Sequence, residues 1–572
     1  MALESASRSR VLGVRAARVL GVAIAVVALA WTGAIIAVST PAFEGWLRAR
    51  LAGALEARLP GATLGDVSVD WRFRLSAGPV HAPPVAGRPG VDVEQVRAAP
   101  SLRALLSRRL EARAVSLRGL RLSGPVAIGP LDVDLSLSRG EAGDRADGTV
   151  RLPGGGRAAL TGSRDASGWR ARVRAALGPG DLPAALRGGA TRLERGEGDL
   201  DVSLEAPLDL SRADARVELL AREVFLSGEH VAPEPVGPLR GSASGLLAWD
   251  ARARRIALRE GVLSLAGAVT VQATGELGAD GPRPFSLSLR ADGVDWGAAV
   301  AALPPQLAPP AGAPAPSGTL DARLDVSGPL ATPAGWTVRA HLDLARLRAA
   351  GRRSPSPLRA PFVHRPDPAN RARALVVGPA NPDFVPIAEL PEHVVRAVTT
   401  SEDAGFFGHA GFDFDELRNA LVEGAEAGRL GRGGSTITQQ LAKNLFLSPE
   451  RTLARKVREA TIAIGLEAAV PKRRLLEIYV NVAEWGPGLW GIGAASRHWF
   501  GKDARALTPK EAAFLASIIP SPIRYHAMYA RGSPSDAWEA HVNDLLFRMT
   551  EQGALTDDEL AEGIAARLFF GG

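Results

Sequence analysis

The chain has 572 residues and no cysteine, which excludes disulfide bonds, thiolate catalysis and cysteine-ligated metal sites. This length exceeds what one hydrophobic core supports, and a composition of 46% hydrophobic and 23% charged residues excludes global disorder, so two or more folded domains are expected. The 68 basic and 61 acidic residues leave a formal charge of +7, an excess that does not call for nucleic acid and suits a membrane surface or a phosphate-bearing substrate equally well.

The N-terminus combines a basic tail, residues 1–18, with an uncharged apolar run from Val19 to Val38. A helix needs about 20 apolar residues to cross a bilayer, so we predict a transmembrane helix over residues 19–40. A cleaved signal peptide is the alternative, although its apolar core is usually ~7–15 residues long. Because basic flanks stay in the cytoplasm, the rest of the chain is expected on the other side of the membrane.

Residues 45–350 consist of short runs in which apolar and polar residues alternate, separated by Gly, Pro, Asp and Arg. Period two gives a strand one buried and one wet face, so this interval is predicted to be antiparallel sheet. A Pro/Ala-rich stretch at 303–318 is interpreted as a linker within it. The clearest alternating runs are Val67–Leu75, Leu131–Leu137, Leu200–Leu204, Phe285–Leu289 and Leu320–Val326.

One unit of this region, Val91–Leu122, is predicted to be a strand, a short helix bearing Leu102, Leu105 and Leu106, and a second strand. This order resembles the opening of AsmA-like proteins, which place β-rich grooves behind an N-terminal membrane helix and include members implicated in lipid handling. The resemblance implies an AsmA-like domain over residues 45–350. A generic β spacer that holds the C-terminal domain away from the membrane is the alternative.

A second breaker-rich stretch, 351–378, is the predicted domain boundary, and the pattern beyond it is helical. Thr508 to Glu511 form a capping box with proline at the first helical position, Asp413 is a similar cap, and Ser448-Pro449 is interpreted as another helix start. We therefore predict a helical domain at 379–532 and a helical tail at 533–572.

Charged residues gather within this helical domain. Arg455, Lys456 and Glu459 are three and four residues apart, so they share one side of a helix whose other side has the apolar stripe Leu453, Val457, Ala460 and Ile464. A solvated ion pair is the default interpretation, but the following turns are apolar nearly all round, which favours a buried helix with its charges on a cleft. All five lysines of the chain lie between residues 443 and 510, either through arginine-biased codon usage or because a phosphate needs a compact charge.

Five blocks between about 380 and 530 occur in a fixed order: SEDAGFFGHAGFD, GGSTITQQLAKNLFL, RKVREA, PKRRLLEIYVNVAEWGPGLWGIGAAS and LTPKEAAFLASIIPSPIRY. Together they resemble the peptidoglycan glycosyltransferase domain of glycosyltransferase family 51, in particular the monofunctional biosynthetic transglycosylases. The resemblance implies a multidomain α+β protein with a mainly α-helical, lysozyme-like catalytic domain. It also implies inverting, processive polymerisation of glycan strands from lipid II, with release of undecaprenyl diphosphate. The Ser-x-x-Lys motif of bifunctional transpeptidases does not occur.

The resemblance assigns roles to individual residues. Glu402 becomes the general base that takes the proton of a sugar hydroxyl, and Glu459 becomes a second essential carboxylate. Glu459 could position cations, hold a divalent cation (Mg²⁺ or Mn²⁺) or tune Glu402, and the sequence does not choose. The predicted substrate-binding residues are Asp403, Ser435, Thr436, Gln439, Gln440, Lys443, Asn444, Arg455, Lys456 and Lys472, of which the lysines and Arg455 suit a diphosphate.

The remaining features of the blocks receive structural interpretations. His409 is expected to make structural hydrogen bonds, and the Gly-rich run 426–435 lacks the spacing of a phosphate-binding Walker loop and is interpreted as a mobile gate. Structural roles are expected for Glu477, Tyr479, Asn481 and Glu484, and core positions for Trp485, Trp490 and Trp499.

For location and partners, the resemblance implies a single-pass inner-membrane protein with a cytoplasmic N-terminus and a periplasmic catalytic domain. Its expected partners are lipid II, the growing glycan strand, membrane lipid and a cell-wall synthesis complex, without nucleic acid and without an established cofactor. Two alternatives stay open: a lytic muramidase, and a non-catalytic lipid-handling or scaffold protein. The cationic cluster speaks against the muramidase, because glycan hydrolysis leaves no diphosphate to bind.

Overall fold

The computed structural model describes residues 29, 32 and 40–571, with gaps at 85–89, 102–110, 124–127, 141–142, 182–190, 280, 349–355, 367–373, 417, 420–433 and 449. Among the described residues, no helix combines the length and apolar character needed to cross a membrane. Almost all of the predicted membrane helix at 19–40, the predicted short helix at Leu102–Leu106 and nearly all of the Gly-rich run lie outside the described residues.

The chain divides into two compact units. The first comprises residues 1–189, 195–220 and 248–252, and the second comprises 190–194, 221–247 and 253–572. The second unit therefore joins the last strands of the β-rich region to the helical region.

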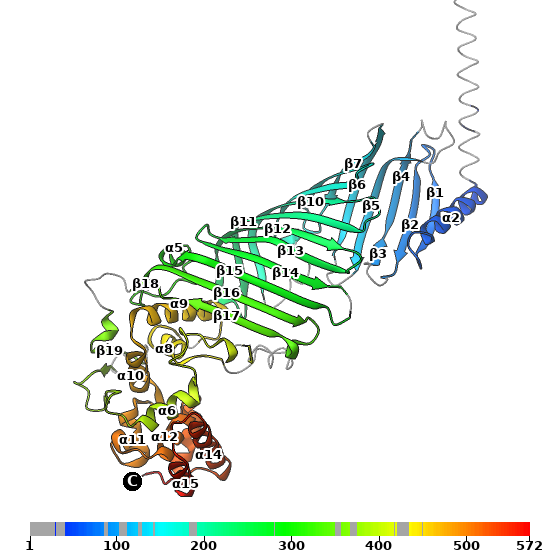
Figure 1. Cartoon of the computed structure of the whole chain (residues 1–572). Helices are drawn as coiled ribbons and strands as arrows, with labels where there is room; N and C mark the ends of the chain where they lie inside the picture. Colours follow the sequence, from blue (N-terminus) through cyan, green and yellow to red (C-terminus); the bar gives the residue numbers. More distant parts are fainter. Residues whose placement is uncertain are drawn as a thin grey trace, which may run out of the picture. The chain divides into compact units, whose positions relative to one another are not determined.

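The β-rich region is antiparallel, as the alternating runs predict, and the eighteen strands among its described residues are assigned to one sheet (Figure 1). Helix α2 (Pro41–Glu56) precedes the first strand and buries Leu47 against Val67 and Ala77. The strands up to residue 206 are β1 (Thr63–Val69), β2 (Leu75–Ala82), β3 (Gly90–Val93), β4 (Gln95–Pro100), β5 (Ala112–Ser123), β6 (Ile128–Gly140), β7 (Gly143–Arg151), β8 (Arg157–Asp165), β9 (Gly168–Leu177) and β10 (Arg192–Ala206).

Four of the five alternating runs lie within single strands, namely β6, β10, β15 (Pro284–Asp295) and β16 (Ser317–Pro329). The fifth prediction is wrong, because the run Val67–Leu75 is interrupted after Val69. Asp70 Oδ1 accepts hydrogen bonds from the backbone N–H groups of Arg72 and Arg74, both at 2.9 Å, and closes a turn that alternation alone does not reveal.

The later strands continue the sheet as β11 (Arg212–Gly228), β12 (Ala232–Asp250), β13 (Arg255–Leu265), β14 (Val269–Gly278), β15 (Pro284–Asp295), β16 (Ser317–Pro329), β17 (Thr337–Asp343) and β18 (Leu347–Arg348), with helix α5 (Trp296–Ala301) after β15. Register separates the faces: Ala273, Leu289, Leu324 and Ala340 are successive cross-strand partners on the apolar face. The neighbouring row is polar, so each of these strands has one apolar and one polar face.

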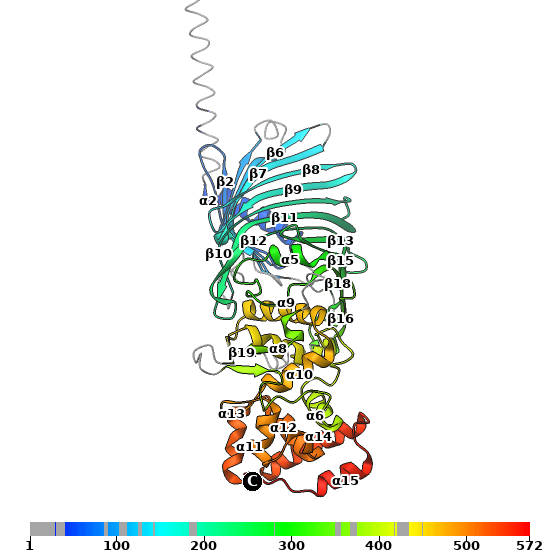
Figure 2. The same cartoon turned by 90° about the vertical axis from the view of Figure 1, so that its left-hand side faces the viewer.

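The helical region follows, with helices α6 (Glu392–Glu402), α8 (Ile437–Phe446), α9 (Leu453–Ala469), α10 (Lys472–Val482), α11 (Ile492–Phe500), α12 (Pro509–Ile518), α13 (Pro522–Tyr525), α14 (Asp536–Glu551) and α15 (Asp557–Ala565). Short hairpins are formed by β19 (Phe362–His364) with β20 (Leu375–Val377) and by β21 (Glu484–Gly486) with β22 (Leu489–Trp490). Figure 2 shows the later helices gathered around the C-terminus.

One hydrophobic core holds the helical region together. Trp485 and Trp499 are fully buried in it, as predicted, whereas Trp490 is half-buried. Leu358 and Val377 belong to the same core, so the stretch 351–378 contributes packing residues to the helical region. The tail contributes too, because Leu545 and Leu546 of α14 are buried there.

Two helix starts test the capping predictions. Thr508 caps α12 in a reciprocal capping box with Glu511, as predicted. The prediction for Ser448-Pro449 is wrong, since α9 begins at Leu453 with Thr452 as its N-cap. Thr452 Oγ1 accepts from Arg455 N at 3.2 Å, which meets one of the unpaired N–H groups of the first turn.

Candidate active site

Glu402 is the last residue of α6, a helix that buries Val394, Ala397 and Val398 in the core. This packing fixes the end of the helix and with it the Glu402 side chain. Its Oε2 accepts a hydrogen bond from Gln440 Nε2 at 2.8 Å. Its Oε1 is buried and has no hydrogen-bond partner among the described residues. A buried acceptor without a donor is costly, so this oxygen is suited to receive one from a ligand.

The surroundings of Glu402 favour its protonated form more than water does. Burial is the largest cause, and it raises the pKa of the Glu402 carboxyl; Asp403 raises it further, while the Gln440 hydrogen bond, the Lys443 charge and the Ser401 side chain lower it. A carboxylate with a raised pKa is a stronger base than an ordinary surface glutamate.

Gln440 is held in place from behind by Tyr479. The Tyr479 hydroxyl donates to Gln440 Oε1 at 2.9 Å, which leaves the amide nitrogen pointing to Glu402. Burial raises the pKa of Tyr479 well above its usual value, so the hydroxyl keeps the proton that it donates. The hydrogen-bonded series Tyr479–Gln440–Glu402 therefore orients the carboxyl. From the sequence, Gln440 was predicted to bind substrate, and this role of Tyr479 was not predicted.

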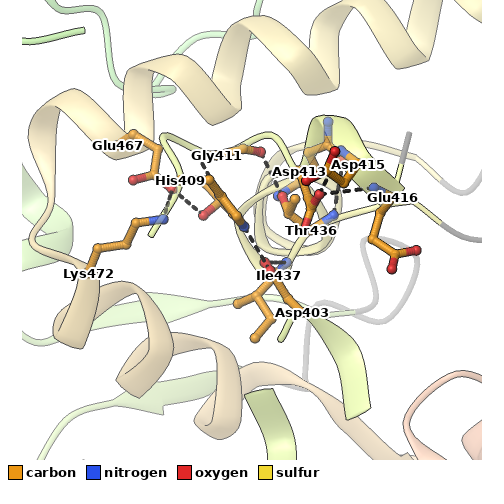
Figure 3. Close-up of polar contacts among 12 residues, drawn as sticks. Asp403, His409, Gly411, Asp413, Asp415, Glu416, Thr436, Ile437, Glu467 and Lys472 are labelled. Carbon is orange, nitrogen blue, oxygen red and sulfur yellow. Dashed lines mark hydrogen bonds and ion pairs between the residues drawn. The ribbon is translucent and has the colours of Figure 1, made fainter. Parts of the chain in front are cut away.

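Asp403 ties the Glu402 segment to the start of α8 (Figure 3). Its Oδ2 accepts from Ile437 N at 2.9 Å, and its Oδ1 lies 2.7 Å from His409 Nε2. Thr436 caps the same helix end in a capping box with Gln439, and its hydroxyl donates to Gly411 O at 2.7 Å. An acidic side chain at a helix N-terminus is stabilised by the helix dipole.

Hydrogen bonds hold the His409 ring of this turn in one tautomer. Gly411 N–H donates to His409 Nδ1 at 3.1 Å, so the ring proton lies on Nε2 and is donated to Asp403 (Figure 3). Asp403, His409 and Asp413 are close enough together to suggest a metal site. Both ring nitrogens and both Asp403 oxygens are already used in hydrogen bonds, however, so the cluster fits a structural lock better than a metal site.

The second charged cluster lies on α9, where Glu459 is only 3% exposed. Glu459 Oε2 accepts from Arg455 Nη1, and Oε1 accepts from Lys456 Nζ. Lys456 Nζ also donates to Ser435 Oγ at 3.1 Å, which links the cluster to the residues before α8. Arg455 Nε is buried and lacks a partner among the described residues, so the cluster keeps an unused donor.

Lys443 connects the two carboxylates electrostatically. It lies on α8 with part of its side chain exposed, yet desolvation of the ammonium is the largest cause that lowers its pKa, and Arg455 and Lys456 lower it further. The charges of Glu459 and Glu402 act in the opposite direction. Lys443 therefore interacts electrostatically with both acids of the site.

A divalent cation does not fit Glu459 in this arrangement. Both of its oxygens already accept from Arg455 and Lys456, and a metal ion there would have to displace these donors and face two positive charges. Of the roles left open for Glu459, the contacts favour the positioning of the cations.

The other predicted site residues are more dispersed. Lys472 Nζ donates to Glu467 Oε1 at 2.7 Å and lies 4.3 Å from the centre of the Phe406 ring, away from Glu459. Thr438 also donates to Glu467, a buried partner that the sequence predictions missed. Asn444 is half-buried on α8 near Lys443.

The polar residues Glu477 and Asn481 of α10 and Glu484 of the following hairpin serve the fold, as expected. Glu477 Oε2 accepts from Ile387 N at 2.9 Å, and Asn481 brackets the backbone of Val385 with both of its amide atoms. Glu484 Oε1 accepts from Gly488 N at 3.0 Å. The Glu477 and Asn481 bonds hold the segment before α6 against α10, and the Glu484 bond closes the turn between β21 and β22.

The helical region is similar in sequence to known proteins. The transglycosylase family model matches residues 371–550. The biosynthetic peptidoglycan transglycosylase of Nitrobacter winogradskyi is 49% identical over 156 residues, which cover 27% of this chain and 69% of that protein. The corresponding protein of Azoarcus sp. is 44% identical over 175 residues, or 29% of this chain and 76% of that protein.

A bifunctional relative matches the same part. Penicillin-binding protein 1A of Aquifex aeolicus is 41% identical over 181 residues, which cover 32% of this chain and 24% of that protein. The family model does not reach the β-rich region, so the AsmA-like resemblance stays a prediction. The chain belongs to the biosynthetic peptidoglycan transglycosylases of glycosyltransferase family 51, and it is a peptidoglycan glycosyltransferase that polymerises glycan strands.

Proposed function

We propose that Glu402 is the general base of this polymerase and that the α9 cluster binds the diphosphate leaving group. The observation that carries the proposal is the open Oε1 of Glu402, a buried acceptor on a carboxyl whose other oxygen is held by Gln440. A sugar hydroxyl is a weak nucleophile and needs such a positioned acceptor as the new bond forms.

In this proposal lipid II is the acceptor and the growing glycan strand is the donor. The 4-hydroxyl oxygen of lipid II attacks the anomeric carbon of the strand's terminal sugar, and its proton passes to Glu402 Oε1. The bond from the anomeric carbon to the phosphate oxygen breaks, and its electron pair leaves with undecaprenyl diphosphate. A single displacement from the opposite face inverts the anomeric configuration.

The departing diphosphate needs donors and positive charge, which Lys443, Arg455 and Lys456 supply. Glu459 lies between Arg455 and Lys456 and holds both before substrate arrives, so little reorganisation is needed during the reaction. Three cations against one carboxylate leave the cluster net positive. Asn444 is the proposed hydrogen-bonding partner for a sugar or acetamide group.

Five of the predicted substrate-binding residues have a positioning role in this proposal. Asp403, Thr436 and Gln439 hold the start of α8, Gln440 orients Glu402, and Lys472 pairs with Glu467. Ser435, by contrast, remains at the cluster through Lys456 and can contact a phosphate.

The membrane placement completes the proposal. The uncharged run Val19–Val38 anchors the chain in the inner membrane as a single span, with the basic tail in the cytoplasm and the lysozyme-like catalytic domain in the periplasm. A lipid-linked substrate supports such an anchor. The β-rich region is AsmA-like in this proposal, and the expected partners of the chain as a whole include membrane lipid and a cell-wall synthesis complex.

The test is polymerisation of lipid II by the purified full chain. We expect glycan polymer from the unaltered protein and none from Glu402→Gln, which keeps the shape of the side chain and removes the base. Glu392→Gln is the control, because Glu392 lies on the same helix with its side chain 79% exposed. Polymerisation at the normal rate by Glu402→Gln would exclude Glu402 as the base, and shortening of preformed strands would point to hydrolysis.

A further inference from the structure

Helix α9 contacts the β-rich region on the side opposite its charged cluster. From these contacts we infer that the β11–β12 turn and the last strands of the sheet position α9, so that the β-rich region belongs to the catalytic machinery and is more than a spacer. The inference rests on the proposed role of Arg455, Lys456 and Glu459 at the diphosphate. All the contacts lie within the second compact unit.

The first contact is at the N-terminus of α9, where a helix leaves backbone N–H groups without intrahelical partners. Leu453 N donates to His230 O at 2.8 Å, and Ala454 N donates to Val231 O at 2.9 Å. His230 and Val231 form the turn between β11 and β12. The β-rich region therefore supplies acceptors to two N–H groups at the start of α9, in addition to the cap by Thr452.

Apolar packing reinforces the cap. Ala454 is 3% exposed and lies in a small core with Val231, Ala232 and Val236. A helix end that is both hydrogen-bonded and packed has little freedom to fray or to shift along its axis. Arg455 follows directly in the chain, so the cap fixes the start of the charged cluster.

The second contact is in the middle of α9 (Figures 1 and 2). Ile464 is buried against Ala291, Val294, Leu320 and Leu347 at the end of the apolar sheet face. The sheet there packs on the helix as it would on a partner layer of one domain. This contact makes the helix and the sheet end a single core.

Gly465 marks the closest approach. A Cβ at this position would lie 2.3 Å from the carbonyl oxygen of Pro314, in the Pro/Ala-rich stretch after α5. Glycine is among the least favourable residues inside a helix, so its presence here has a packing reason. The stretch 303–318 is thus held against α9 and does not behave as a free linker.

The two sides of α9 are related by helix geometry. Ile464 is nine residues after Arg455, and at about 100° per residue this places it about half a turn round the helix. Glu459 lies close to the direction of Arg455, four residues on. Movement of the sheet end would therefore move Arg455 and Lys456, because one stiff helix carries these two cations and Ile464.

The test compares two substitutions on one strand of the full chain, Leu320→Ala and Leu324→Ala. Both residues point from the apolar face of β16, but Leu320 belongs to the buried cluster that contains Ile464, whereas Leu324 lies outside it. We expect Leu320→Ala to lower kcat/KM for lipid II by about 10- to 100-fold, the loss that a displacement of order 1 Å can cause, and Leu324→Ala to change it little. Inhibition by inorganic pyrophosphate should weaken with Leu320→Ala only.

A second variant keeps the test decisive if Leu320→Ala does not fold. Gly465→Ala adds one methyl group toward Pro314, and Gly53→Ala in α2, where nothing lies within 4 Å, is its control. We expect Gly465→Ala to weaken inhibition by pyrophosphate and to leave thermal unfolding cooperative. Activity and inhibition equal to the controls in both sheet-contact variants would overturn the inference.

Arg455→Gln separates this outcome from failure of the proposed function. If Arg455→Gln also polymerises normally and keeps its inhibition by pyrophosphate, the diphosphate site itself is misassigned. If Arg455→Gln is inactive while Leu320→Ala and Gly465→Ala behave like the unaltered chain, the site stands and only the positioning by the sheet is wrong.

Discussion

Glu402 and Glu459 are both buried carboxylates, yet their neighbours give them opposite tasks. Glu402 has one neutral amide donor and an open oxygen, which suits a group that must accept a proton. Glu459 has a cation on each oxygen, which suits a group that must hold charges in place. Different surroundings commonly divide acid–base and electrostatic work between two carboxylates in this way.

The pH dependence of polymerisation tests the setting of Glu402. Activity needs the deprotonated base, so kcat/KM should rise with pH through the Glu402 pKa, which burial places above the ordinary glutamate value. Lys443 lowers that pKa, so Lys443→Gln should move the acid limb to higher pH. A limb that stays in place or moves to lower pH in Lys443→Gln would contradict the assignment.

His364 gives a pH dependence of stability that is independent of catalysis. Burial lowers the pKa of this histidine from 6.5 to about 4. Between these two pH values the unfolded chain therefore binds more protons than the folded chain. The contribution of His364 to the free energy of unfolding is complete above pH 6.5 and is lost as pH falls toward 4. At about 1.4 kcal/mol per pKa unit, the loss amounts to roughly 3 kcal/mol.

Urea unfolding of the full chain between pH 4 and 7 measures this term. His364→Gln should flatten the curve of unfolding free energy against pH over that interval, compared with His541→Gln. His541 lies on the exposed side of α14 and serves as the control. An unchanged slope in His364→Gln would show that other groups cause the acid sensitivity.

At the scale of elements, the start of α8 depends on one side chain from another helix end. Asp403→Ala removes the acceptor of Ile437 N and the partner of His409, and it should lower the unfolding free energy by about 1–3 kcal/mol, the cost of an unpaired buried group. Thermal unfolding of the full chain measures the change. Asp403→Asn should lose less, because its amide oxygen can still accept from Ile437 N. Full stability with lost lipid II affinity would instead assign Asp403 to substrate binding.

The elements also show how far local sequence patterns predict structure. Alternation located β6, β10, β15 and β16, because period two is a property of neighbouring residues alone. It failed at Asp70, where one side chain captures two backbone N–H groups and ends the strand. The Ser448-Pro449 signal misplaced the start of α9, which is capped by Thr452 and also by backbone carbonyls more than 200 positions earlier in the chain.

The site was predictable to a similar extent. Motif resemblance brought Glu402, Glu459 and the cations to notice, and the helical spacing placed Arg455, Lys456 and Glu459 together, as the structure has them. The orienting chain through Gln440 and Tyr479 was not predictable, because it joins α6, α8 and α10 through packing that no local pattern records.

At the scale of the whole molecule, we propose that the membrane anchor gives the chain access to its lipid-linked substrate. Arginines at Val26 and Val27 should abolish anchoring, since each costs about 2.5–3.5 kcal/mol at the centre of a spanning helix. Flotation with phospholipid vesicles measures this, with paired arginines at Ser5 and Ser7 in the basic tail as the control. Unaltered flotation of the Val26→Arg, Val27→Arg variant would show that another part of the chain holds the membrane.

The most direct measurement of the central claim separates binding from chemistry at Glu402. Single-turnover transfer by the full chain is followed with saturating lipid II, alongside the affinity of each variant for lipid II. We expect Glu402→Gln to bind lipid II as the unaltered chain does. Its rate of glycosyl transfer should be about 10²- to 10⁴-fold lower, which is the usual contribution of a general base. Transfer within a few-fold of the normal rate, or a loss explained entirely by weaker binding, would contradict it.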